Sequence, residues 1–158
     1  MRHVLAFAAA LGLGLLAFAA AAHDYKAGDI HVVHPWARAT PPGAPTGAAY
    51  MTIANSGAVA DRLVAVSSPA AQRAEVHQMT MEGDIMRMRH LADGLEIAAG
   101  GEVALEPGGY HLMLIGLDAP LVEDTRVPLT LEFARAGTIE VELAVERPGG
   151  DGGDHGGH

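Results

Sequence analysis

The sequence predicts an all-β domain, built as an antiparallel β-sandwich or small barrel. Three observations support this fold class. Short segments rich in β-forming residues recur along the chain between Gly, Pro and Asp. The last two such segments alternate between apolar and polar residues, and no segment after residue 22 has the pattern of a convincing amphipathic helix.

The first expected strand, 30–34, precedes a Pro-rich loop at 40–45. The remaining expected strands are 48–53, 63–66, 74–81, 85–89, 95–98, 102–105, 110–115, 127–134 and 138–145. Turn residues separate them at Asn55-Ser56-Gly57, Gly100-Gly101, Pro107-Gly108-Gly109 and Ala136-Gly137. This spacing of short strands is that of a sandwich or barrel, and the chain shows no internal repeat.

The two final strands show the clearest alternation. In 138–145 and the residue after it, Ile139, Val141, Leu143 and Val145 alternate with Glu140, Glu142 and Glu146; in 127–134, Leu129, Leu131 and Phe133 oppose Glu132. A period of two residues predicts antiparallel strands with one buried face and one face in water.

Both ends of the chain differ from the domain at 23–147. Residues 1–22 carry Arg2, an apolar Ala-rich run and Ala20-Ala21-Ala22, which together predict a cleaved secretory signal peptide. The alternative, a membrane anchor, fits less well because the run is shorter than the roughly 20 apolar residues that span a bilayer. Residues 148–158 consist of Pro148 followed only by Gly, Asp and His, so we expect a disordered tail.

Composition excludes several functions. A net charge of −9 argues against nucleic acid as a partner and against adhesion to an anionic membrane surface. Export predicts a periplasmic protein without membrane insertion after signal cleavage. The chain has no cysteine, so a thiol nucleophile, a disulfide and a thiolate-ligated blue copper centre are excluded for it.

Methionine and histidine cluster in the middle of the chain. Five of the 7 methionines lie in residues 79–113, interleaved with three histidines: Met79, Met81, Met86, Met88 and Met113 with His77, His90 and His111. Thioether sulfur is a good ligand for Cu(I) and a poor one for zinc, magnesium or calcium. The alternative is that the methionines fill the core and His111 is structural. The joint pattern favours a copper site.

Strand geometry places many of these residues on one face. Gly83-Asp84 is a plausible type II′ hairpin turn. That turn pairs Met81 with Met86, Met79 with Met88, and His77 with His90, so all six side chains share a face. A three-residue turn would separate the methionines of the two strands. His111 and Met113 are again two residues apart on one expected strand.

These residues resemble the signature of the PCuAC family of periplasmic copper chaperones: His, ten residues, Met, twenty-one residues, then His-x-Met. Here ten residues separate His77 from Met88, while twenty-two separate Met88 from His111, and we expect the extra residue in the loop 90–94. The segments 34–38 (HPWAR) and 107–111 (PGGYH) also resemble the family. The resemblance covers residues 28–145.

The resemblance implies a cupredoxin-like β-sandwich that binds one Cu(I) ion through His77, Met88, His111 and Met113. Secondary candidates are Met79, Met86 and His90. The resemblance also implies delivery of copper to the dinuclear copper centre of cytochrome c oxidase, through subunit II or through another copper chaperone. We expect the protein to be a monomer and not an enzyme. Delivery requires a shallow, accessible site from which a partner can displace the ligands.

Other sites and functions remain open. His155 and His158, with Asp151 and Asp154, form either a Cu(II) site or a plain soluble tail. Cleavage after Ala22 would leave His23 at the amino terminus, where it can chelate Cu(II). His31, His34 and Trp36 are expected to be structural. Alternative functions are a copper scavenger without a dedicated partner, a copper redox enzyme and an adhesion domain.

Overall fold

A computed structural model describes residues 24–148, and every element in this range is a strand. The strands are β1 (Asp24–Ala27), β2 (Ile30–Arg38), β3 (Thr46–Asn55), β4 (Asp61–Ser67), β5 (Ala71–Glu82), β6 (Ile85–His90), β7 (Leu95–Ile97), β8 (Glu102–Leu105), β9 (Tyr110–Leu117), β10 (Arg126–Phe133) and β11 (Gly137–Glu146). The predicted all-β class is confirmed. The predicted signal peptide at 1–22 lies outside the described residues, as does the predicted tail after Pro148.

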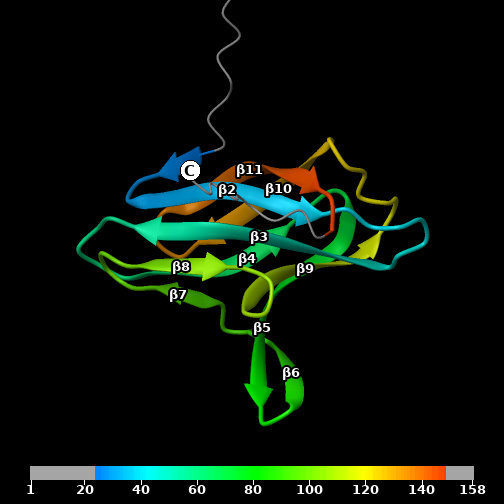
Figure 1. Ribbon diagram of the computed structural model, residues 1–158. Coiled ribbons are helices and arrows are strands. Elements are labelled where there is room, and N and C mark those ends of the chain that lie inside the picture. The colour runs from blue at the N-terminus through cyan, green and yellow to red at the C-terminus, as the bar shows by residue number, and fades with distance from the viewer. Residues whose placement is uncertain (1–23, 149–158) are drawn as a thin grey trace, which may run out of the picture.

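The strands form one curved, open sheet in the order β6-β5-β9-β8-β3-β2-β11-β10-β4-β7, with β1 added beside β2. Figure 1 shows the sheet folded over a common interior, with the β5–β6 hairpin projecting away from the other strands. Most neighbours are antiparallel, as expected. Two pairs are parallel. β2 and β11 meet because the sheet folds over, whereas β8 and β9 follow one another along β3 and pair only at Leu105 and Tyr110, on either side of the turn that joins them. Within residues 24–148 there is no helix long and apolar enough to cross a membrane.

The amino-terminal strands extend beyond the expected segment. The structure adds β1, and β2 continues past Pro35 to Arg38. The ladder between β2 and β3 shifts register between Val33 and Trp36, and His34 has a positive φ of 47° at this bulge. A bulge accommodates proline in a strand because its missing N–H is not needed by the ladder.

The alternation of the last two strands is confirmed. Leu131 and Leu143 are fully buried, and Glu140 and Glu142 are exposed. The interior is a single cluster of apolar side chains from most of the strands. At roughly 25 cal/mol per Å² of buried apolar surface, such a core supplies most of the folding free energy of a protein without disulfides.

Strands β5 and β9 present one face to this core and another away from it. Val76, Leu112 and Leu114 are buried on the core side. The register sets Val76 opposite Leu112 and His77 opposite His111, so the histidines occupy the other face. β5 is paired with β9 from Ala71 to Gln78, and with β6 from His77 to Glu82. Its outer end is therefore supported by β6 alone.

Candidate metal centre

Three histidines form a row across three adjacent strands. His77 on β5 is directly opposite His111 on β9 and directly opposite His90 on β6. The ring centroid of His77 lies 5.6 Å from that of His111 and 5.5 Å from that of His90. His77 is thus the centre of the row, with an imidazole on either side.

The predicted hairpin register is confirmed. Met79 is opposite Met88 and Met81 is opposite Met86. Gly83 has a φ of 64° and Asp84 does not have a positive φ, which is the sign pattern of a type II′ turn. Directly opposed residues project to the same side of a sheet, so the four methionines lie on the face that carries the histidine row.

The four predicted ligands lie on one face but at different distances along it. His77 and His111 are direct neighbours, while Met88 and Met113 are diagonal neighbours of His77 on opposite sides of the row. Diagonal pairs are roughly 7–8 Å apart, within reach of long side chains. Methionine is unbranched and has three rotatable bonds, so both thioethers can turn toward His77.

Glu75 adds a carboxylate to this face, directly opposite Met113. Its Oε2 lies 2.8 Å from His77 Nε2 and 3.8 Å from His90 Nδ1, and its Oε1 accepts a hydrogen bond from Arg73 Nε at 3.0 Å. The hydrogen bond with His77 is the main cause of a lowered pKa of Glu75, with the charges of His90 and Arg73 acting in the same direction and burial opposing them. The group is therefore an anion at neutral pH.

The contact with Glu75 selects one tautomer of His77. An ionised carboxylate only accepts, so in the neutral imidazole of His77 the proton is on Nε2 and Nδ1 keeps a lone pair. His77 Nδ1 is buried and has no hydrogen-bond partner. A buried imidazole nitrogen with a free lone pair, backed by a carboxylate on the other nitrogen, is the arrangement of a metal-ligating histidine.

His111 is fixed by the backbone. Its Nδ1 donates to the carbonyl of Gly109 at 3.3 Å, which leaves Nε2 as the acceptor nitrogen. His111 is only 5% exposed, and burial lowers the pKa of its imidazole, helped by the nearby His77 and opposed by the Gly109 carbonyl. Its neutral form, the form that binds metals, therefore persists to lower pH than in an ordinary histidine.

Exposure increases from the row toward the hairpin tip. His111 is buried, Met113 and Met79 are half-buried, and Met88 is 49% exposed. A ligand set with this gradient is rigid at its inner end and open to a partner at its outer end.

Other sequence candidates lie apart from this face. His31 Nε2 is 3.5 Å from Asp24, and His34 Nε2 is 3.1 Å from Glu146, consistent with structural roles. Trp36 packs its ring 4.6 Å from that of Tyr50. His23, His155 and His158 lie outside the described residues. In the range 24–148, no group of three or more His, Asp or Glu side chains is arranged to hold a metal ion.

Sequence reasoning missed Glu75. The available signal was the alternation of the expected strand 74–81, which places residue 75 on the face of His77. A charged residue at such a position is usually read as solvent-facing. Its partial burial depends on the pairing of β5 with β9, which sets Glu75 opposite Met113 and which the sequence pattern did not predict.

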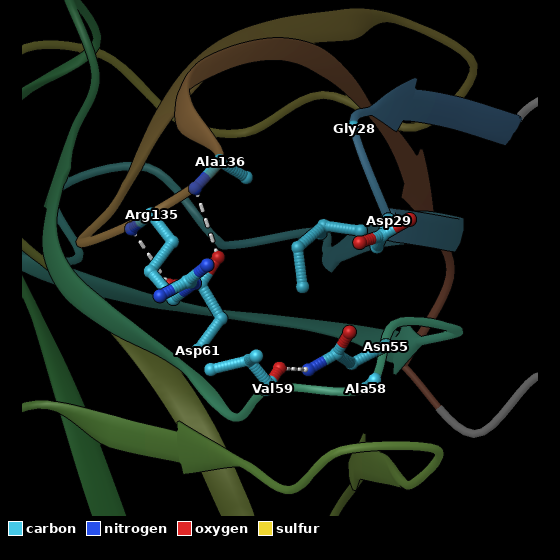
Figure 2. Close-up of a pocket in the computed structure, with 9 residues that line it drawn as sticks. Gly28, Asp29, Asn55, Ala58, Val59, Asp61, Arg135 and Ala136 are labelled. Carbon is cyan, nitrogen blue, oxygen red and sulfur yellow. Dashed lines mark hydrogen bonds between the residues drawn. The ribbon is translucent and has the colours of Figure 1, made fainter.

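A pocket of about 330 Å³ lies elsewhere, where β3 ends and β10 turns into β11. Figure 2 shows Asp61 directed at the N–H groups of Arg135 and Ala136, and Asn55 directed at the carbonyl of Val59. Its lining contains no histidine or methionine. These hydrogen bonds join two loops, which indicates a structural role.

Comparison with solved structures supports the fold. The chain is similar to the copper-bound PCuAC domain from PmoF2, with 28% identity, a TM-score of 0.68 and coverage of 80% of this chain and 99% of that one. It is also similar to the Cu(I) form of DR1885 from Deinococcus radiodurans, with 27% identity, a TM-score of 0.58 and coverage of 80% and 83%. The expected likeness to PCuAC domains is thus confirmed for the fold.

Sequence comparison gives the family. A family model described as "Putative lipoprotein LpqE-like" matches residues 30–145. The "Putative lipoprotein Lxx21020" of Leifsonia xyli subsp. xyli (strain CTCB07) is 31% identical over 121 residues, which cover 77% of this chain and 72% of that protein. The strands that carry the histidine row all fall inside the matched range, and the chain belongs to the LpqE-like family.

Proposed function

We propose that this protein is an exported Cu(I)-binding metallochaperone whose cargo ion is held by His77, Met88, His111 and Met113. The observation that carries the proposal is the buried Nδ1 of His77, which has no hydrogen-bond partner, in a ring whose centroid lies 5.6 Å from that of His111. Thioethers lie on both sides of this pair on the same face. Similar solved domains, from PmoF2 and from Deinococcus radiodurans, are described as copper-bound and Cu(I)-bound.

The donor set suits a soft monovalent ion. Two neutral imidazoles and two neutral thioethers match the preference of Cu(I) for nitrogen and sulfur ligands. Neutral ligands leave the single positive charge of the ion in place. Glu75, 2.8 Å from His77 Nε2, compensates part of that charge and keeps the ligand tautomer.

The exposure gradient suits delivery by ligand exchange. Met88 is exposed on the hairpin, while His111 is held in place at the buried end of the row. A partner's ligand can replace Met88 first while the imidazoles still hold the ion. The ion then passes on without ever being free in solution. Binding and transfer, rather than catalysis, are the function that this arrangement supports.

The acceptor is a copper protein outside the cytoplasm. We favour the dinuclear copper centre of cytochrome c oxidase, reached through subunit II or through another copper chaperone, with the protein acting as a periplasmic monomer. The PCuAC resemblance of the His/Met pattern supports this acceptor. The signal-like sequence at 1–22 and the lipoprotein description of the family support export.

The test is an anaerobic titration of the purified protein with Cu(I), in competition with a coloured Cu(I) chelator. A tight site that is weakened in His111→Gln and in Met113→Leu would support the proposal, and unchanged affinity in both variants would refute it. Mixing the loaded protein with a copper-free subunit II domain then separates delivery from scavenging, because a scavenger would retain its ion.

A further inference from the structure

We infer that the β5–β6 hairpin carries a second Cu(I) site, made only of the thioethers of Met79, Met81 and Met86. This inference rests on the proposed function, because it concerns the same cargo ion. The site is distinct from the histidine row and lies nearer the hairpin tip.

The geometry brings the three sulfur atoms within reach of one ion. Met81 and Met86 are directly opposed, and Met79 is next to Met81 on the same face of β5. Directly opposed side chains have Cβ atoms roughly 4.5–5.5 Å apart. The sulfur lies two bonds beyond Cβ on a flexible chain, so rotamer changes alone can close the three thioethers around an ion. The type II′ turn fixes the register on which this depends.

Packing does not account for these methionines. Met51 shows what a core methionine looks like in this fold, with 2% of its surface exposed. Met81 and Met86 are instead 60% and 62% exposed. Two long apolar side chains directly opposed in water contribute little burial, so their chemistry rather than their volume explains the arrangement.

The surroundings favour a soft ion over a hard one. Between Gln78 and Arg89, the charged side chains of the two strands lie on the other face, where Arg87 Nε donates to Glu82 Oε2 at 2.7 Å. Arg89 on that face donates to Gln78 Oε1 at 3.1 Å. Both arginines therefore have partners on that other face, and the methionine face near the hairpin tip offers sulfur as its donor. Magnesium and calcium require oxygen ligands, whereas Cu(I) accepts thioethers alone.

The hairpin site is connected to the main site by a continuous series of methionines on one face of the hairpin. The Met79–Met88 pair lies between the Met81–Met86 pair and the histidine row. Met88 is a ligand of the proposed main site, and Met79 is a ligand of the hairpin site. An ion taken up near the tip can therefore reach the histidines by exchanging one thioether at a time, with no change in its oxidation state.

The experiment is an anaerobic Cu(I) titration of the purified protein against chelators of graded strength. We expect two equivalents, the second held more weakly. The double variant Met81→Leu/Met86→Leu should lose the weaker equivalent and keep the tighter one at unchanged affinity. Leucine keeps the apolar volume and removes the sulfur. Ile85→Leu is the matched control, because Ile85 is at the same tip, similarly exposed, but on the opposite face.

A second measurement identifies the ligands directly. In protein labelled with ¹³C at the methionine methyl groups, Ag(I), a closed-shell stand-in for Cu(I), should shift the Met81 and Met86 signals after the main site has filled. Absence of these shifts, or a double variant that still binds two equivalents, would overturn the inference and leave the exposed methionines as a surface for protein contact.

The two proposals fail differently. His111→Gln should remove the tight equivalent and leave the hairpin equivalent in place. Wild-type protein that binds only one weak equivalent, lost in Met81→Leu/Met86→Leu, would support the hairpin site and refute the main one.

Discussion

The carboxylate of Glu75 lies 2.8 Å from the Nε2 atom of His77, two residues further along the same strand. The two side chains share a face because residues i and i+2 of a strand project to the same side. This contact leaves the buried Nδ1 of His77 as the nitrogen that can bind a metal. A carboxylate behind a histidine usually tunes metal affinity as well as orientation.

Glu75→Gln should therefore weaken Cu(I) binding about tenfold, since loss of such an outer partner typically costs 10- to 100-fold. Glutamine keeps the size of the side chain but removes its charge and allows it to donate. Chelator competition measures the change. Glu82→Gln is the control, because Glu82 is an exposed carboxylate on the same strand but on the other face. Equal affinities in the two variants would contradict a role for Glu75.

Met113→Leu should change Cu(I) affinity, whereas Met51→Leu should change only thermal stability. Met113 is half-buried beside the histidine row, whereas Met51 is buried in the core opposite Leu105 on β8. A Met-to-Leu exchange of similar volume usually costs less than about 1.5 kcal/mol of stability. Only Met113→Leu should weaken Cu(I) binding, while Met51→Leu should affect only the melting temperature. Equal binding by both variants would place Met113 outside the site.

His111 should make the copper-free protein less stable as the pH falls. Burial lowers the pKa of His111, so the unfolded chain binds this proton more tightly than the folded chain. Stability from the neutral imidazole is therefore present above the unfolded pKa of roughly 6.5 and declines as the pH drops from there through the folded pKa. Denaturant unfolding at several pH values, compared with His111→Gln, measures this slope. An equal slope in the variant would show that other groups cause it.

Asp61 should stabilise the fold without affecting copper. Burial raises its pKa, but three backbone N–H donors, from Arg62, Arg135 and Ala136, outweigh burial and lower the pKa below its ordinary value. Its stabilisation is therefore present above the unfolded pKa of roughly 3.9 and is lost as the pH falls through the lower folded pKa.

Asp61→Ala would leave these amides without their acceptor and should cost about 3 kcal/mol, since a single unsatisfied buried donor costs roughly 1–3 kcal/mol. Urea unfolding at neutral pH measures the loss. Cu(I) affinity should stay the same, because Asp61 pairs with Ile97 on β7 and not with the strands of the histidine row. A wild-type free energy of unfolding in Asp61→Ala would contradict the proposed stabilisation by these three hydrogen bonds.

Local patterns in the sequence were sufficient for most of the strands and for the β5–β6 hairpin. Alternation predicted the buried and exposed faces of β10 and β11, and the Gly83-Asp84 turn predicted the pairing of Met79 with Met88. The alternation and the turn both depend only on residues that are close together in the sequence. The strand β1 was missed although it is also local, since Gly28-Asp29 joins it to β2 in a two-residue hairpin. The parallel pairing of β2 with β11 depends on distant segments meeting, which no local pattern encodes.

The histidine row shows the same division. The pairing of His77 with His90 follows from the turn, and the pairing of His77 with His111 does not, because 33 residues lie between them. We assigned the two histidines to one metal site from their ligand chemistry and from the family resemblance, not from a predicted pairing. Their position as direct neighbours required the β5–β9 register, whereas the place of Glu75 beside His77 follows from alternation along β5.

The outer end of β5 has a further consequence for hydrogen exchange. Beyond Met79 the strand has β6 as its only neighbour, and an isolated two-stranded ribbon is marginally stable in water. Amide protons near the turn should therefore exchange through local openings, while those next to Val76 exchange only through larger unfolding events. The hairpin can then change shape, and accumulate substitutions, at little cost to the rest of the protein.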